Sequence, residues 1–151
     1  MGKMRGLTRG ELKKFLSAGW VARIATAKED GVPYIATVWY EFDGRDFYLG
    51  GRAKSTWAQH IKKNPNVALH IAKDSSPYTR ALIEGKAEVV EGPSPIRGKW
   101  LKVANKMSVR YLGRRGPEYL VPTLDRPRLW IRITPTRVTT WEGVEWHRKY
   151  I

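Results

Sequence analysis

The chain has 151 residues, and its 28 lysines and arginines against 14 aspartates and glutamates give a formal net charge of +14. A hydrophobic content of 42% is that of a globular protein and excludes global disorder. The absence of cysteine excludes disulfides and thiolate metal sites. We expect one domain over residues 1–151. We also expect a cytoplasmic protein, since no stretch is apolar enough to span a membrane and the start lacks a secretory signal.

The positive charge indicates anionic partners in general, such as nucleic acid, phosphorylated cofactors or acidic substrates. The cations are spread along the chain and do not form one basic tail, which argues against a nucleic-acid-binding arm.

The first third of the chain predicts one helix and two strands. Thr8 and Glu11 form a capping box for a short helix that ends near Ala18. Residues 20–28 are rich in strand formers, and a turn leads into a second strand over residues 32–42. Because both faces of this second strand carry apolar side chains, we expect it to be central and covered on both sides.

The middle of the chain predicts a hairpin followed by a helix. Asp43-Gly44 is a hairpin turn signal, and the short strand after it ends in Gly50-Gly51. Ser55 is a good N-cap for a helix over residues 56–63, which must stop at Asn64-Pro65.

The rest of the chain predicts three or four more strands and one more helix. Residues 66–72 and 80–92 alternate as strands, with Gly85 marking a bulge. Ser94-Pro95 predicts a helix start, residues 114–127 are irregular, and two final strands are separated at Thr134-Pro135. Six or seven strands with three helices predict a mainly β fold, a small antiparallel barrel with helices at its rim.

The residues between the two glycines and the helix form a basic corner. Arg52 and Lys54 lie just before Ser55, where a helix N-terminus offers free N–H groups and a partial positive charge. This combination favours an anion site, with phosphate as the expected anion. The alternative is an ordinary solvated basic loop.

Motifs that carry chemistry by themselves are missing from the sequence. The three histidines, His60, His70 and His147, have no chelating spacing, and we expect no metal site. A nucleophile elbow, a dinucleotide fingerprint and a Walker loop are absent. Catalytic residues are therefore unassigned, and a bound cofactor must supply any redox reactivity. Four tryptophans fill the core or stack on a planar ring: Trp39, Trp57, Trp130 and Trp141.

Several motifs together resemble the split-barrel flavin-binding family that includes pyridoxamine-phosphate oxidase. They are GVPYIATVWYEFDG, FYLGGRAKS, a helix ending at NP before NVALHI, RALIEGKAEVVEG and TPTRVTTWEG, and the resemblance spans residues 7–143. It implies a six- to seven-stranded antiparallel split β-barrel with peripheral helices, an FMN cofactor, and an obligate homodimer with both FMN sites in its interface.

The resemblance also implies which residues bind the cofactor. The strand around residues 36–40 would lie along the flavin, the corner at residues 48–55 would hold the phosphate, and the start of the RALIEG strand would approach the cofactor, as would a late tryptophan, often from the partner. The cofactor-binding residues so implied are Thr37, Val38, Trp39, Tyr48, Gly50, Arg52, Lys54, Ser55, Trp57, Arg80 and Trp141.

Departures from the oxidases point to another branch of the family. Ala36 and Glu41 stand where the oxidases have basic residues, and residues 145–148 replace their substrate-binding run. The resemblance therefore favours an FMN-dependent or deazaflavin-dependent reductase acting on an unidentified small substrate, with the deazaflavin coenzyme as the alternative cofactor. Two other hypotheses remain open: a nucleic-acid-binding β-barrel, and a barrel that binds cofactor without turnover.

Overall fold

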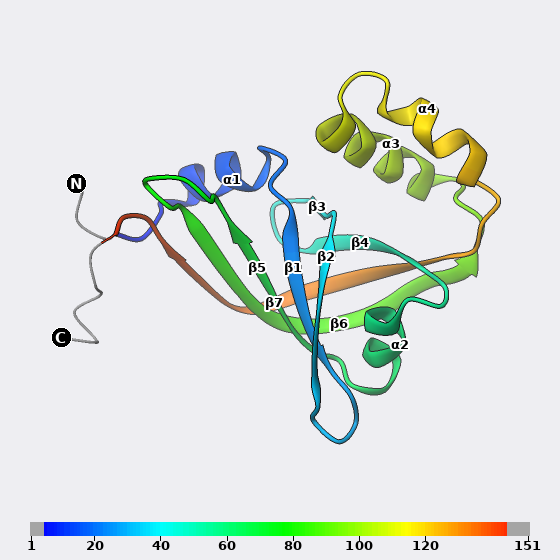
Figure 1. Cartoon of the computed structure of the whole chain (residues 1–151), viewed down its shortest axis with the longest axis horizontal. Coiled ribbons are helices and arrows are strands. Elements are labelled where there is room, and N and C mark those ends of the chain that lie inside the picture. Colours follow the sequence, from blue (N-terminus) through cyan, green and yellow to red (C-terminus); the bar gives the residue numbers. More distant parts are fainter. Residues whose placement is uncertain (1–4, 145–151) are drawn as a thin grey trace.

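The computed structural model describes residues 5–144, in which seven antiparallel strands form one sheet (Figure 1). The strand order is β2-β1-β5-β6-β7-β4-β3. The strands are β1 Ala22–Ala27, β2 Pro33–Val38, β3 Glu41–Phe42, β4 Phe47–Arg52, β5 Asn66–Ala72, β6 Arg80–Ser94 and β7 Arg128–Trp141. The helices are α1 Arg9–Leu16, α2 Thr56–Lys63, α3 Lys99–Leu112 and α4 Gly116–Leu120, with a 3-10 turn at Val121–Thr123.

The sheet curls without closing, since its two end strands, β2 and β3, do not pair with each other within residues 5–144. This confirms the predicted antiparallel split barrel with peripheral helices. In Figure 1, α3 and α4 lie together on one side of the sheet, apart from α1 and α2. Within the described part of the chain, no helix has the length and apolar character that crossing a membrane requires.

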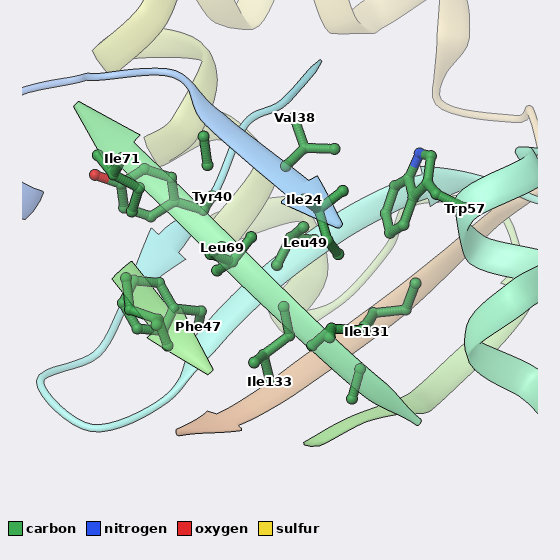
Figure 2. Close-up of a cluster of buried hydrophobic side chains, with 14 of the residues drawn as sticks. Ile24, Val38, Tyr40, Phe47, Leu49, Trp57, Leu69, Ile71, Ile131 and Ile133 are labelled. Atoms are coloured by element: carbon green, nitrogen blue, oxygen red, sulfur yellow. The ribbon is translucent and has the colours of Figure 1, made fainter. Parts of the chain in front are cut away.

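The main core fills the inside of the curled sheet (Figure 2). Alternate residues point inward because successive side chains of a strand lie on opposite faces, as Ile24 of β1 and Leu69 of β5 show. Helix α2 contributes Trp57, which is 8% exposed. The fully buried Tyr40 donates its hydroxyl to the carbonyl of Leu16, 2.7 Å away, and so ties the end of α1 to the core.

The strand predicted over residues 32–42 differs from the structure in two ways. It is interrupted at Trp39 and Tyr40 and becomes β2 and β3. It is also not central, because β2 is an edge strand and most of its residues are exposed. The prediction was wrong because an apolar pattern on both faces does not fix the place of a strand in the sheet order.

Three other boundaries also depart from the sequence-based prediction. Helix α3 begins at Lys99, because β6 continues to Ser94, where it still pairs with Arg128. The final segment is one strand, β7, because a bulge at Gly85 accommodates Pro135 opposite it. The segment predicted to be irregular contains α4 and the 3-10 turn.

Gly85 is needed at the bulge because β7 passes directly against it. A Cβ atom at residue 85 would lie 2.5 Å from the carbonyl oxygen of Thr134. We expect Gly85→Ala to lower the free energy of unfolding by about 1–3 kcal/mol, the usual effect of overpacking. Urea denaturation measures this. The control is Gly10→Ala in α1, where a Cβ meets nothing within 4 Å and the stability should not fall. Equal effects at both sites would contradict the role of the bulge.

Candidate functional site

The basic corner lies at one end of the β4–β7 pair and contains two more arginines than the sequence analysis assigned to it. Arg52 at the end of β4 is the register partner of Arg128 at the start of β7. The neighbouring loops are also joined, since the N–H of Ala53 donates to the carbonyl of Pro127 at 3.2 Å. This pairing places Arg126 and Arg128 beside Arg52 and Lys54. From here on, "basic corner" means these four residues.

The cations of the basic corner make no direct contact with a carboxylate of the described residues. Within residues 5–144, none of the four cations takes part in an ion pair. Burial lowers the pKa of Arg128, and the positive charges of Arg52 and Arg126 lower it further. Like charges held close together in this way attract an anion strongly.

The N-terminus of α2 adjoins the basic corner. Ser55 occupies the N-cap position, as predicted, but its side chain makes no capping hydrogen bond. Its N–H is already used, donating to the carbonyl of Arg52 at 2.9 Å. The first turn of α2 therefore keeps N–H groups that no side chain satisfies, and the first turn contains no acidic residue.

Next to the basic corner, on the same outer face of β4 and β7, lies an aromatic layer covered by α3. Gly50 is the register partner of Trp130, whose ring lies so close that a Cβ on residue 50 would be 3.0 Å from it. Tyr48 packs beside Trp100 of α3 in the same layer. Trp39 stacks on Tyr111 with ring centroids 4.9 Å apart, so three of the predicted cofactor residues belong to this layer.

A third part of the predicted site is an open face of the sheet, away from α3. Thr37, Arg23 and His70 are register partners across β2, β1 and β5. On the same face the guanidinium of Arg80 lies 4.9 Å from the ring centroid of Trp141 and donates to the carbonyl of Gly143 at 2.8 Å. The Nε atom of Arg80 is buried and has no partner among the described residues. An orphaned donor of this kind fits a ligand acceptor at this face.

His70 makes this face sensitive to pH. Burial lowers its pKa below the ordinary value, and the positive charges of Arg23 and Arg80 lower it further. The unfolded chain therefore binds a proton more readily than the folded chain, so the contribution of His70 to stability rises with pH up to about 6.5 and is constant above it. We expect His70→Gln to flatten this rise in a series of urea titrations at different pH. An unchanged rise would show that other groups cause it.

The structure does not bring all of the predicted residues into one place within a single chain. Arg80 pairs with Trp141 at one end of the β6–β7 ladder, whereas Arg128 and the basic corner lie at the other end. Val38 and Trp57 are buried in the main core, where Trp57 packs against Gly51. His147 and the run at residues 145–148 lie outside the described residues.

Four functional candidates were missed by sequence reasoning. Arg126 and Arg128 belong to the run DRPR at the start of the last strand. This basic run could have indicated an anion site, but only the pairing of β4 with β7 places it beside Arg52. Arg23 and His70 look like ordinary alternating strand residues, and only the register of β1 with β5 places them together.

Comparison with known proteins identifies the family. The model of the pyridoxamine 5'-phosphate oxidase family matches residues 8–142, which is most of the chain. The chain belongs to this family. No curated protein matches it.

Three solved structures illustrate the proteins that share this fold. The conserved hypothetical protein Rv2991 from Mycobacterium tuberculosis has a TM-score of 0.75 and 23% identity, covering 99% of this chain and 100% of that one. An F420 reductase has a TM-score of 0.66 and 26% identity, covering 83% and 94%. A FAD-binding protein from Mesorhizobium loti has a TM-score of 0.66 and 20% identity, covering 95% and 98%.

Proposed function

We propose that this protein is an FMN-binding oxidoreductase acting on a small substrate, with the basic corner as its phosphate site. The proposal rests on the four cations of the basic corner. Strands β4 and β7 and their loops hold them beside the N-terminus of α2, and none of them has an ion-pair partner within residues 5–144. A phosphate monoester is a small dianion, and positive side chains together with helix N–H groups are its usual ligands.

We further propose that the complete site forms between two copies of the chain. One chain keeps the Arg80–Trp141 pair and the basic corner at opposite ends of the β6–β7 ladder, so a single cofactor cannot contact both within one chain. A second copy would also cover the exposed edge strand β2, on which Ile35 is 68% exposed. Sedimentation velocity of the purified protein tests the dimer, and a monomer at micromolar concentration would contradict it.

The chain's own residues would bind and orient the cofactor. The basic corner would hold the phosphate, Thr37 and Trp39 would lie along the ring system, and the buried Arg80 Nε would donate to a ring acceptor. FMN supplies hydride transfer when bound, chemistry that no side chain of this protein provides.

An absorption spectrum of freshly purified protein, followed by FMN titration, tests the proposed function. We expect a yellow protein, or saturable quenching of tryptophan emission as FMN is added. Riboflavin, which lacks the phosphate, is the matched control and should bind far more weakly. Equal affinity for both would contradict the phosphate site, and no binding of either would contradict the proposed function.

The deazaflavin coenzyme is a second candidate cofactor. The basic corner has four cations, whereas a phosphate monoester carries at most two negative charges, and the surplus favours a ligand with an acidic tail. The resemblance to an F420 reductase at 26% identity supports the same candidate. The cofactor that quenches tryptophan emission at the lower concentration identifies the better ligand. Tight binding of single-stranded nucleic acid that weakens steeply with salt would instead favour the nucleic-acid hypothesis.

A further inference from the structure

Beneath α3, three aromatic rings lead from the buried interior to the surface. Trp130 of β7 and Trp100 of α3 are stacked, with ring centroids 4.8 Å apart and planes 9° from parallel. Tyr48 of β4 continues the line, with its ring centroid 6.0 Å from that of Trp100. Trp130 is 2% exposed and Trp100 4%, whereas Tyr48 is half-buried. At these ring distances an electron can pass readily from one aromatic side chain to the next.

The surroundings of the two tryptophans do not stabilise an indole radical cation. Both indole N–H groups are buried and have no hydrogen-bond partner among the described residues. An indole that loses an electron therefore finds no acceptor for its proton and remains a radical cation. The ammonium group of Lys99, 4.9 Å from the ring centroid of Trp100, opposes a further positive charge there.

Tyr48, in contrast, has a proton acceptor in place. Its hydroxyl donates to Oδ2 of Asp43 at 3.0 Å. The other carboxylate oxygen of Asp43 accepts the N–H groups of Arg45, at 2.9 Å, and Asp46, at 2.7 Å. Although burial acts to raise the pKa of Asp43, these hydrogen bonds outweigh it and hold the pKa below its ordinary value. The carboxylate is therefore ionised at neutral pH and ready to take the phenolic proton.

We propose that Tyr48 and Asp43 form a redox site that repairs the Trp100–Trp130 pair after a one-electron oxidant, such as an oxygen-centred radical at the protein surface, has taken an electron from an indole and has itself been reduced to an anion. In this step one electron passes from the phenol of Tyr48 to the oxidised indole, which becomes neutral tryptophan again. The phenolic proton passes to Asp43, and a neutral tyrosyl radical remains. Asp43 then releases the proton to solvent. A thiol at the surface gives one electron and one proton to the tyrosyl radical, which becomes tyrosine again while the thiol becomes a thiyl radical. The site carries oxidising equivalents out of the interior.

This inference goes beyond flavin binding and is tested on the full chain without added cofactor. Laser photoionisation removes an electron from tryptophan, and a cobalt(III) ammine complex in solution takes the electron up irreversibly. Transient absorption then follows the loss of the indole radical and the growth of the tyrosyl radical. In the wild type we expect the tyrosyl signal to grow as the indole signal decays. Tyr48→Phe should remove a large part of this growth, and Trp100→Phe should slow it.

Asp43→Asn is the most direct variant. The side-chain oxygen of asparagine can still accept the N–H groups of residues 45 and 46, so the turn is kept, but the amide cannot take the proton of Tyr48. We expect slower tyrosyl growth in this variant, with Asp43→Glu restoring part of the rate. Tyr119→Phe, which removes an exposed tyrosine of α4, is the matched control and should leave the signal nearly unchanged.

Two results would overturn the proposal. One is wild-type tyrosyl yield in Tyr48→Phe, which would place the radical on another tyrosine. The other is a wild-type rate in Asp43→Asn, which would show that the carboxylate takes no part. Melting curves of each variant identify any that fails to fold, and in that case the Asp43→Asn and Asp43→Glu pair decides. Neither result bears on FMN affinity, so the proposed function and this inference fail separately.

Discussion

Replacing Arg52 and Lys54 together by alanine is expected to weaken FMN binding by about 100-fold or more. Each charge-assisted contact with the phosphate is worth about 1.5–3 kcal/mol, so losing two removes about 3 kcal/mol or more. A difference of about 1.4 kcal/mol corresponds to tenfold in the dissociation constant. Fluorescence titration of FMN measures the change, and riboflavin affinity should fall much less because riboflavin has no phosphate.

The control for this double variant is Lys13→Ala with Lys14→Ala. Both lysines lie on α1, are exposed, and carry the same total charge as the pair in the basic corner. In Figure 1, α1 and α2 lie well apart. At physiological salt, charges more than about 8 Å away are largely screened, so the control should keep wild-type affinity. An equal loss in both double variants would mean that the overall positive charge, and not the basic corner, attracts the cofactor.

Arg110→Ala is expected to destabilise the fold by about 3–5 kcal/mol, the usual effect of removing one partner of a buried ion pair. Arg110 of α3 donates to a carboxylate oxygen of Glu41 at 2.8 Å and to the carbonyl of Tyr40 at 3.0 Å. The side chain of Glu41 is 8% exposed and that of Arg110 14%. Without Arg110, a buried carboxylate and a carbonyl both lose a donor. Equilibrium denaturation with urea measures the loss.

Lys106→Ala provides a contrast on the same carboxylate. The ammonium of Lys106 lies 2.9 Å from the other oxygen of Glu41, but its side chain is 66% exposed. An exposed ion pair contributes little, so we expect a loss below about 1 kcal/mol. Similar losses from Lys106→Ala and Arg110→Ala would show that burial does not set the strength of this cluster.

Features with a local cause could be predicted from the sequence. The capping box of Thr8 and Glu11 forms as expected, because both partners lie within one helical turn. Ser55 occupies the N-cap position of α2, and Gly85 lies at a bulge. An antiparallel barrel followed from alternation and short links, and its split form was implied by the family resemblance. The count of seven strands agrees only because the strand predicted over residues 32–42 is two strands, β2 and β3, and the two predicted final strands are one, β7.

Features that depend on register could not be predicted from local patterns. Arg52 and Arg128 lie side by side only because β4 pairs with β7 in antiparallel fashion, and 75 residues separate the two positions in the chain. The placement of β2 at the sheet edge failed for a related reason, since apolar residues on both faces predict burial but do not specify the partner.

The pairing of β6 with β7 has a consequence for how this barrel can be altered. The two strands pair from Arg80 and Trp141 to Ser94 and Arg128, so residues 95–127, with α3 and α4, are an insertion at the tip of one long hairpin. Surface insertions at hairpin tips can be exchanged without changing the register of the strands that bear them. The helical segment can thus be exchanged as one unit if the contacts of α3 with Tyr40 and Glu41 are kept. A swap would change the cover over Tyr48 and Trp130 and replace Arg126, while Arg52, Lys54 and Arg128 would stay in place.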